Sequence, residues 1–142
     1  MNIDPQPDSA NAPDTSLDLA DWHARFIQAL TARDVAAYAA FLAPDCVVQI
    51  NNSMPVYSRT AMERAYGAYL ALFRTLNIDV LALHGSGNEL SAEVILHYIL
   101  ADDSAEVVQC AYFIARQPDG LIASVRVYGN ASRVFKPFIR AT

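Results

Sequence analysis

Hydrophobic spacing divides the chain into a first half that predicts helices and a second half that predicts strands. From Leu19 to Leu30, large apolar side chains recur three or four residues apart, which predicts an amphipathic helix that ends near Ala32. A second, short helix is expected after Asp34, whose side chain can cap it, and Pro44 is expected to stop it. The chain therefore begins with two helices joined by a tight connection.

One short strand and a third helix are expected next. Residues 46–50 (CVVQI) are rich in β-branched side chains, which favour a strand. Ser58 or Thr60 can cap the third helix, and Thr60 with Glu63 fits a capping box. The buried stripe of this helix is expected to consist of apolar side chains at helical spacing: Met62, Ala65, Tyr66, Tyr69, Leu72 and Phe73.

From Leu76 onward the spacing changes to that of strands. Turn residues follow at 84–88, which hold two glycines, at 102–104 and at 117–120, where Gln-Pro-Asp-Gly is a strong turn sequence. Because the last turns are short, the strands are expected to form an antiparallel meander. The predicted strands are residues 77–83, 90–101, 105–116 and 121–128.

The strand at 90–101 is apolar on both faces. Leu96 and Tyr98 share one face with their apolar neighbours, while Ile95 and Ile99 lie on the other face with His97. A sheet with one face in water would alternate more cleanly. We therefore expect one face to pack on the helices and the other on a second copy of the chain, as a homodimer.

Composition narrows the function classes. The 142 residues are 54% apolar and 18% charged, with a net charge of −5. The ten Lys and Arg residues are scattered, which argues against nucleic acid as a partner. No apolar run is long enough for a membrane span, so no membrane partner is expected.

The N-terminus and the cysteines bear on organisation and location. Residues 1–15 are expected to be a flexible tail, because residues 1–14 hold three prolines and no large apolar cluster. Thr15 with Asp18 resembles a capping box, and a single domain is expected over 16–142. The N-terminus has no secretory pattern, and Cys46 and Cys110 have no metal-ligand spacing, which favours reduced cysteines in a cytoplasmic protein.

Titratable residues give few signals of chemistry. The three histidines show no spacing of metal ligands, so neither a metal nor a cofactor is expected. His23 is expected to point partly away from the apolar stripe of its helix, and His97 is interpreted as an interface or surface residue, with a catalytic base as the alternative. Asp102 and Asp103 are adjacent in a turn and are expected to be solvated rather than to converge on a substrate.

The order of these elements resembles the nuclear-transport-factor-2-like fold, in particular its SnoaL-like branch. The matching segments are residues 25–34 (RFIQALTARD), residues 41–45 (FLAPD), and the turn at 118–120 before the strand that contains Arg126. The resemblance covers about residues 16–136. It implies an α+β fold in which a curved antiparallel sheet wraps around three N-terminal helices and encloses a cone-shaped pocket, and it implies a dimer through the outer sheet face.

The resemblance does not bring the catalytic residues of the better-known branches. At the positions where ketosteroid isomerases have a general-base Asp, an oxyanion-binding Tyr and a protonated Asp, this chain has Ile50, Phe26 and Ala111. These side chains neither accept a proton nor donate a hydrogen bond. Arg126 loosely resembles the Arg of the limonene-epoxide hydrolases, although no Asp is placed in a strand beside it.

The resemblance also implies which residues line the pocket. A two-residue period places Ser124, Arg126 and Tyr128 on one face of the last strand, and the resemblance turns that face toward the pocket. Arg126 would then be its polar centre, or else a structural arginine that pairs with an acid or reaches solvent. Cys110 is expected to face away. The expected lining residues are Trp22, Phe26, Ile50, Tyr66, Leu96, Tyr98, Ala111, Phe113, Arg126 and Tyr128.

Two functions remain open. In the first, the domain binds an apolar or anionic small molecule with a carbonyl or carboxylate, as an isomerase, cyclase or hydratase without a cofactor. Arg126 would then polarise the oxygen, and a tyrosine such as Tyr66 would relay a proton. In the second, the domain is a non-catalytic ligand binder or a dimer-assembly module, which the missing Asp base supports.

Overall fold

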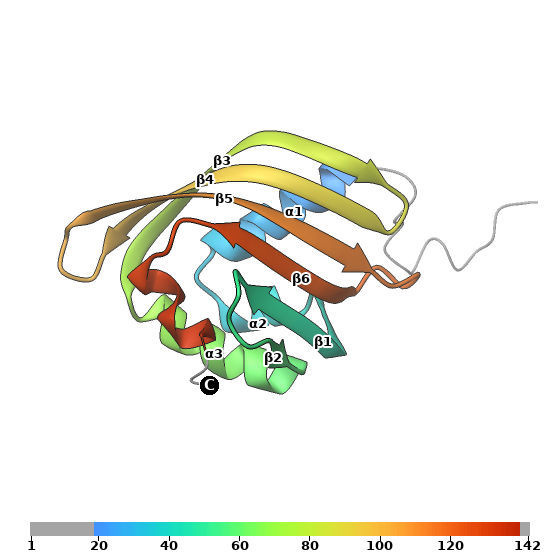
Figure 1. The fold of residues 1–142 in the computed structure, drawn as a ribbon, viewed down its shortest axis with the longest axis horizontal. Helices are drawn as coiled ribbons and strands as arrows, with labels where there is room; N and C mark the ends of the chain where they lie inside the picture. Colours follow the sequence, from blue (N-terminus) through green and yellow to red (C-terminus); the bar gives the residue numbers. More distant parts are fainter. Residues whose placement is uncertain (1–18, 140–142) are drawn as a thin grey trace, which may run out of the picture.

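The computed structural model describes residues 19–139, in which three helices precede a run of long strands (Figure 1). The expected tail at residues 1–15 and the capping box of Thr15 and Asp18 lie outside the described residues. In chain order the elements are α1 (Leu19–Thr31), α2 (Val35–Ala39), β1 (Leu42–Ile50), β2 (Val56–Tyr57), α3 (Arg59–Leu70), β3 (Phe73–Ser86), β4 (Glu89–Leu100), β5 (Ala105–Arg116), β6 (Ile122–Gly129) and the 3₁₀-helix η2 (Arg133–Phe138).

The strands form one curved six-stranded sheet in the order β2-β1-β6-β5-β4-β3. The sheet is open, because β2 and β3 are its edges. The meander of β3 to β6 is antiparallel, as expected, but β1 lies parallel to β6, with Val48 opposite Val125. The helices cover one face: α1 packs against β3, and α3 packs against β1 and η2 (Figure 1).

The helix caps follow the sequence closely. Asp34 caps α2 by accepting hydrogen bonds from the backbone N–H groups of Ala36 and Ala37. Ser58, not Thr60, caps α3, and its hydroxyl accepts from the N–H of Ala61. Because side-chain oxygens satisfy these first amides, both helices begin where the sequence predicts.

The expected role of Pro44 is wrong. Helix α2 ends at Ala39, and Pro44 lies inside β1, which begins four residues earlier than predicted. The pairing of β1 with β6 shifts register between Leu42 and Val47. A proline has no amide hydrogen for a ladder, and an irregular stretch of strand is a place where none is needed.

Strand β3 is longer than its sequence pattern suggests. It spans Phe73–Ser86, and its last residues pair with β4 up to Ser86 opposite Glu89. Gly85 therefore belongs to the strand, with φ 135°, and the turn is confined to Gly87 and Asn88. The expected loop at 84–88 is mostly strand because the ladder with β4 continues through it.

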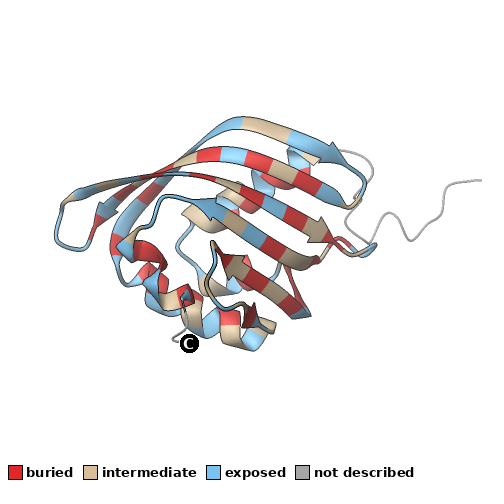
Figure 2. Ribbon diagram, viewed as in Figure 1, coloured by how far each residue is buried: buried red, intermediate tan, exposed pale blue. Residues whose placement is uncertain are grey.

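Burial alternates along the strands, so that the sheet has an inner and an outer face (Figure 2). On β4, Leu96 and Tyr98 face the helices and are buried, whereas Ile95 and Ile99 lie on the outer face. This confirms the predicted division of β4 into two faces. The core therefore lies between the inner face of the sheet and the helices.

The 3₁₀-helix η2 has no counterpart in the sequence analysis. Ser132 caps it by accepting from the N–H of Val134. Phe135 and Phe138 are both buried and face the core, while Pro137 lies within its last turn. This segment thereby closes one end of the space between α3 and the sheet.

Candidate functional site

An apolar cavity lies between the helices and the inner face of the sheet. Its volume is about 90 Å³. Helices contribute Phe26 and Leu30 from α1 and Met62 from α3, and η2 adds Phe135 and Phe138. The strands contribute mostly aliphatic side chains: Val48, Ile50, Leu76, Ile78, Leu96, Cys110, Val125 and Val127.

Four tyrosines complete the cavity wall, and three of their hydroxyls are engaged by the protein. The hydroxyl of Tyr66 donates to the backbone oxygen of Leu30 at 3.3 Å. Tyr69 and Tyr98 share a hydrogen bond of 2.7 Å between their hydroxyls, both buried. The last of the three, Tyr112, is described next.

The Tyr112 hydroxyl lies 2.5 Å from Nε2 of His23. His23 is in α1 and keeps only 3% of its surface exposed, and burial lowers the pKa of its imidazole below the usual value. Burial also raises the pKa of the Tyr112 phenol. Both shifts favour uncharged side chains at neutral pH, so the pair is held by a hydrogen bond between neutral groups.

The fourth tyrosine, Tyr38, has no hydrogen-bond partner among the described residues. Its ring stacks on that of Tyr66, with the ring centres 4.3 Å apart and an angle of 14° between the planes. Tyr38 is 6% exposed. Burial is the largest cause that raises the pKa of its phenol, so the hydroxyl stays protonated.

The cavity contains no ionisable side chain that is charged at neutral pH. Its lining side chains are aliphatic or aromatic, together with Cys110, the tyrosines and Met62. Burial raises the pKa of the Cys110 thiol to about 11, so that the thiol is not a ready nucleophile. The cavity is thus suited to an apolar compound, to which the wall presents a few neutral hydroxyl groups.

A family model for the SnoaL-like domain matches residues 23–125, most of the chain. This chain belongs to the SnoaL-like domain family. The segment includes α1 from His23 onward, the meander as far as Val125, and most of the cavity wall. A search of curated protein sequences finds no match to the chain.

Solved structures share the fold of this SnoaL-like domain at low sequence identity. A Catenulispora acidiphila protein with a ketosteroid isomerase-like fold, in complex with trimethylamine, superposes with a TM-score of 0.71 at 13% identity over 84% of this chain and 92% of that one. An epoxide hydrolase of the limonene-epoxide hydrolase type from Mycobacterium tuberculosis gives 0.70 at 15% identity, over 87% and 90%. Another M. tuberculosis protein, in complex with estradiol-17β-hemisuccinate, gives 0.66 at 18% identity, over 80% and 92%.

Several of the expected lining residues do meet at the cavity of the SnoaL-like domain. Phe26, Ile50, Tyr66 and Leu96 form part of its wall. Trp22 and Tyr98 are buried one layer behind it: Trp22 stacks on Phe26 with ring centres 5.5 Å apart, and Tyr98 holds the hydroxyl of Tyr69. Whether these residues contact a ligand stays a prediction.

The predicted face of β6 is wrong. Val125 and Val127 line the cavity, whereas Arg126 lies on the outer face, where its guanidinium is 5.3 Å from the ring centre of Phe113. Tyr128 lies beside it, and its hydroxyl accepts a hydrogen bond of 3.4 Å from Arg126. On the outer face the charged guanidinium stays in contact with water. On the inner face it would be buried without an acid to pair with, which is costly.

The predicted face of β5, which came from the resemblance, is also wrong. Phe113 is 40% exposed and pairs with Arg126 across the strands, and Ala111 pairs with Tyr128. Cys110, which was expected to face away, lines the cavity. Neighbouring strands share a face in register, so Phe113 and Ala111 lie on the outer face with their partners Arg126 and Tyr128.

Sequence reasoning missed two contributors. His23 is buried against Tyr112 rather than pointing away from the apolar stripe, and its position one residue after Trp22 places it at the edge of that stripe. Phe135 follows the predicted end of the sheet, so no strand or helix period included it. The signal available for it was the cluster of apolar residues in RVFKPF.

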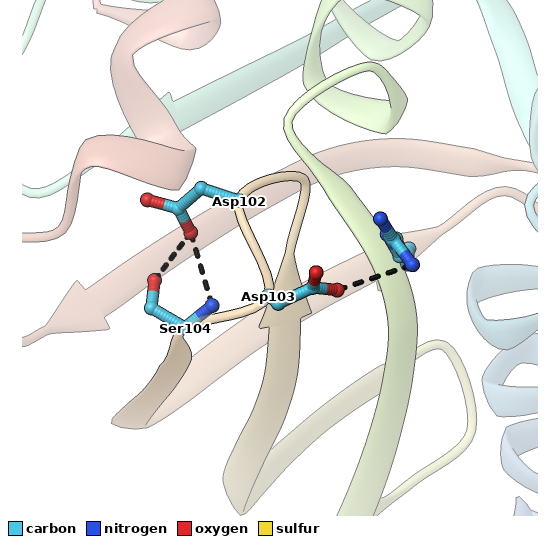
Figure 3. A network of polar contacts seen from close by, with 4 residues as sticks. Asp102, Asp103 and Ser104 are labelled. Carbon is cyan, nitrogen blue, oxygen red and sulfur yellow. Dashed lines mark hydrogen bonds and ion pairs between the residues drawn. The ribbon is translucent and has the colours of Figure 1, made fainter.

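The polar residues of the turns stay outside the cavity, as predicted for Asp102 and Asp103. Figure 3 shows the two carboxylates pointing in different directions: Asp102 accepts from the hydroxyl and the N–H of Ser104, and Asp103 pairs with Arg74 at 3.1 Å. The hydrogen bonds from Ser104 lower the pKa of Asp102. The acids are therefore structural parts of the β4–β5 turn.

The outer histidine also has a structural partner. His97 lies 2.9 Å from Asp79 on the neighbouring strand, and both side chains are about half exposed or more. Among residues 19–139, no group of three or more His, Cys, Asp or Glu side chains could hold a metal ion. None of the helices in that range is long and apolar enough to cross a membrane.

Proposed function

We propose that this SnoaL-like domain binds a small, mainly apolar molecule in the cavity between α1, α3, η2 and the inner sheet face. One observation carries the proposal: the cavity wall is apolar apart from neutral hydroxyl and thiol groups, and several separate elements converge on it. Apolar pockets with a few placed polar groups are the usual form of small-molecule sites. The ligand-bound neighbours, with trimethylamine and with a steroid ester, support such a use of the fold.

The size of the cavity limits the ligand. An apolar cavity of roughly 150 Å³ holds one benzene molecule, and this one measures about 90 Å³. A compound of about the size of benzene or smaller is therefore the expected ligand of the conformation described. A larger one requires the wall to move, and Phe135 is a candidate because it also borders a surface groove next to Ile50 and Asn51.

The test uses cyclopentane as the probe and NMR shifts of the cavity methyl groups as the readout. We expect cyclopentane to shift the methyl resonances of Leu30, Met62 and Leu96. Val127→Phe should abolish the shifts, because the added ring fills the cavity. Val80→Phe is the matched control, since Val80 is 43% exposed and lies outside the cavity wall. Equal binding by both variants would show that the cavity is not the site.

A second candidate function is catalysis without a cofactor, and the contact of Tyr112 with His23 favours it. An imidazole behind a tyrosine on the cavity wall can accept a proton through that hydroxyl. The other candidate groups support it less: Arg126 is on the outer face, and the Tyr66 hydroxyl donates to a backbone oxygen. The remaining alternative is a binder with no enzymatic activity, which the absence of a carboxylate or imidazole from the cavity lining itself supports.

Deuterium exchange separates these two candidates. An isomerase or cyclase that acts next to a carbonyl removes an α-proton, so it should speed exchange of the α-protons of cyclopentanone in D₂O. We expect His23→Gln to lose that exchange if His23 is the base. Exchange no faster than in buffer alone would favour the non-catalytic binder.

We also propose that the outer sheet face joins two copies of the chain. The support is a set of large side chains exposed on this face, which a second copy would cover: Ile99, Val107, Phe113 and Tyr128. We further propose that residues 16–142 form a single cone-shaped domain and that the protein is cytoplasmic. The two cysteines, both buried and unbridged, support the location.

A further inference from the structure

The tyrosines of the cavity wall differ in what their hydroxyls do. Tyr66 donates to a backbone oxygen, Tyr69 bonds Tyr98, and Tyr112 bonds His23. Tyr38 alone of the four makes no hydrogen bond with any residue that the structure describes. One donor is therefore left over within an otherwise satisfied wall.

The position of Tyr38 makes that leftover donor costly. The residue is 6% exposed, and it forms part of the cavity wall. Its hydroxyl has no partner among the described residues and is not one of the fully enclosed unpaired polar atoms, so it reaches open space, where water or a ligand can meet it. Buried polar groups are almost always paired, and an unpaired one calls for a partner from outside the protein.

The surroundings exclude an anion as that partner. No Lys, Arg or His lines the cavity. Two arginines on the helical side are already bonded: Arg33 donates to the backbone oxygens of Leu70 and Phe73, and Arg59 to that of Leu42. A carboxylate would lose its water shell without gaining a counter-charge.

We infer that the ligand of this cavity is an uncharged compound with one hydrogen-bond acceptor, such as a ketone or ether oxygen, which takes the hydrogen bond from Tyr38. The inference rests on the proposed function and narrows its ligand class from a mainly apolar molecule to an uncharged one with a hydrogen-bond acceptor. An acceptor is required rather than a donor, because a ligand that only donates leaves the tyrosine hydrogen unsatisfied. The aliphatic part of the compound fills the space against Val48, Leu96 and Val125.

The first arm of the experiment tests the hydrogen bond. Dissociation constants of cyclopentanone and cyclopentane are measured by NMR titration of the wild type, Tyr38→Phe and Tyr57→Phe. We expect Tyr38→Phe to weaken cyclopentanone about five- to tenfold and to leave cyclopentane unchanged. Tyr57→Phe is the matched control, because this tyrosine is 61% exposed on β2 and lies outside the cavity wall.

The second arm tests charge. Cyclopropanecarboxamide and cyclopropanecarboxylate, each with about as many non-hydrogen atoms as benzene, have nearly the same shape and differ in charge at pH 7. We expect the amide to bind and the carboxylate to bind at least a hundredfold more weakly. Equal affinity for the two would overturn the neutral-ligand inference.

The outcomes separate the inference from the function on which it rests. If cyclopentane and cyclopentanone both bind and Tyr38→Phe changes neither, the cavity is a ligand site but the role of Tyr38 is wrong. If none of the compounds shifts the cavity methyl groups, the proposed function fails and the inference fails with it. Melting temperatures establish that the variants are folded. The comparison of the amide with the carboxylate uses the wild type and needs no variant.

Discussion

Nε2 of His23 and the hydroxyl of Tyr112 lie 2.5 Å apart, although the two residues are 89 positions apart in the chain. This contact joins α1 to the middle of β5, and Phe26 packs edge-on against the same tyrosine ring. Burial favours the neutral form of both the imidazole and the phenol. Folding is therefore coupled to the protonation of His23.

The first prediction concerns pH. Burial lowers the pKa of folded His23 from its ordinary value of 6.5. As the pH falls below about 6.5, the unfolded chain binds this proton and the folded chain does not, so the free energy of unfolding decreases. The loss continues down to the folded pKa, with a slope of up to about 1.4 kcal/mol per pH unit. Urea denaturation at pH 7.5, 6.5 and 5.5 measures it.

His23→Gln is the control for this pH effect, because glutamine can still bond Tyr112 and does not titrate. The variant should show a flatter dependence of stability on pH than the wild type. The exposed His84 and the partly exposed His97 are present in both proteins and cancel from the comparison. Equal slopes in the two proteins would show that His23 does not set the pH dependence.

The second prediction concerns the paired phenols. The hydroxyls of Tyr69 and Tyr98 satisfy each other at 2.7 Å within the core. Tyr69→Phe or Tyr98→Phe alone leaves one buried hydroxyl unpaired and should cost about 1–3 kcal/mol of stability. The double variant removes both groups and should cost clearly less than the sum. Additive losses in urea denaturation would mean that the two phenols are not coupled.

The third prediction concerns Arg126, which stacks on Phe113 on the outer face. Arg126→Met should change the free energy of unfolding by no more than about 1 kcal/mol, since exposed cation–π contacts are weak. Its affinity for cyclopentane should equal that of the wild type. Loss of cyclopentane binding without unfolding would place Arg126 in contact with the ligand site, contrary to its position in the structure.

The fourth prediction tests the proposed dimer. Ile95 lies on the outer face of β4, opposite Gln109 and Asp79 on its two neighbouring strands. Ile95→Asp adds a second carboxylate there and should weaken association at least tenfold, as measured by sedimentation equilibrium. Met54→Asp is the control, since Met54 is an exposed apolar residue in the loop after β1. A monomeric wild type, or a dimer that survives Ile95→Asp, would contradict the interface.

The fifth prediction compares two glycines. A Cβ at Gly67, in α3, would meet only Val35, at 4.0 Å, so Gly67→Ala should stabilise the protein by about 0.5–1 kcal/mol. A Cβ at Gly129 would collide with the backbone of Gln109 and Cys110, so Gly129→Ala should destabilise it by about 1–3 kcal/mol. Thermal melting measures both. Shifts of the same sign would show that close packing at Gly129 is not what distinguishes the sites.

Local signals were enough to place most elements. The capping side chains of Asp34 and Ser58 act on neighbouring amides, and the turn before β6 depends on its own residues. Such short-range interactions depend only on neighbouring residues, so they can be predicted from the sequence. The exact span of β5 and the two faces of β4 followed from it.

The face of a strand is a different kind of information. Period two separates Val125 and Val127 from Arg126 and Tyr128, but which set faces the helices depends on the neighbouring strand. The pocket-facing side of β6 was assigned from the resemblance, and this assignment gave the side that carries Arg126. The more apolar pair of valines was the better physical guide, because burial of an arginine without an acid is costly. The unpaired hydroxyl of Tyr38 could not be foreseen, since it depends on where every other donor and acceptor lies.

The parallel pairing of β1 with β6 has a consequence for the order of folding. Val48 can pair with Val125 only after 77 further residues have been synthesised. A ribosome-bound chain therefore lacks this part of the cavity wall until the last strand emerges. Contacts so distant in sequence form slowly, because the intervening loop must first be closed. The meander of β3 to β5 can assemble earlier from local hairpins. The apolar cavity, which Val48 and Val125 both line, is thus completed late in folding.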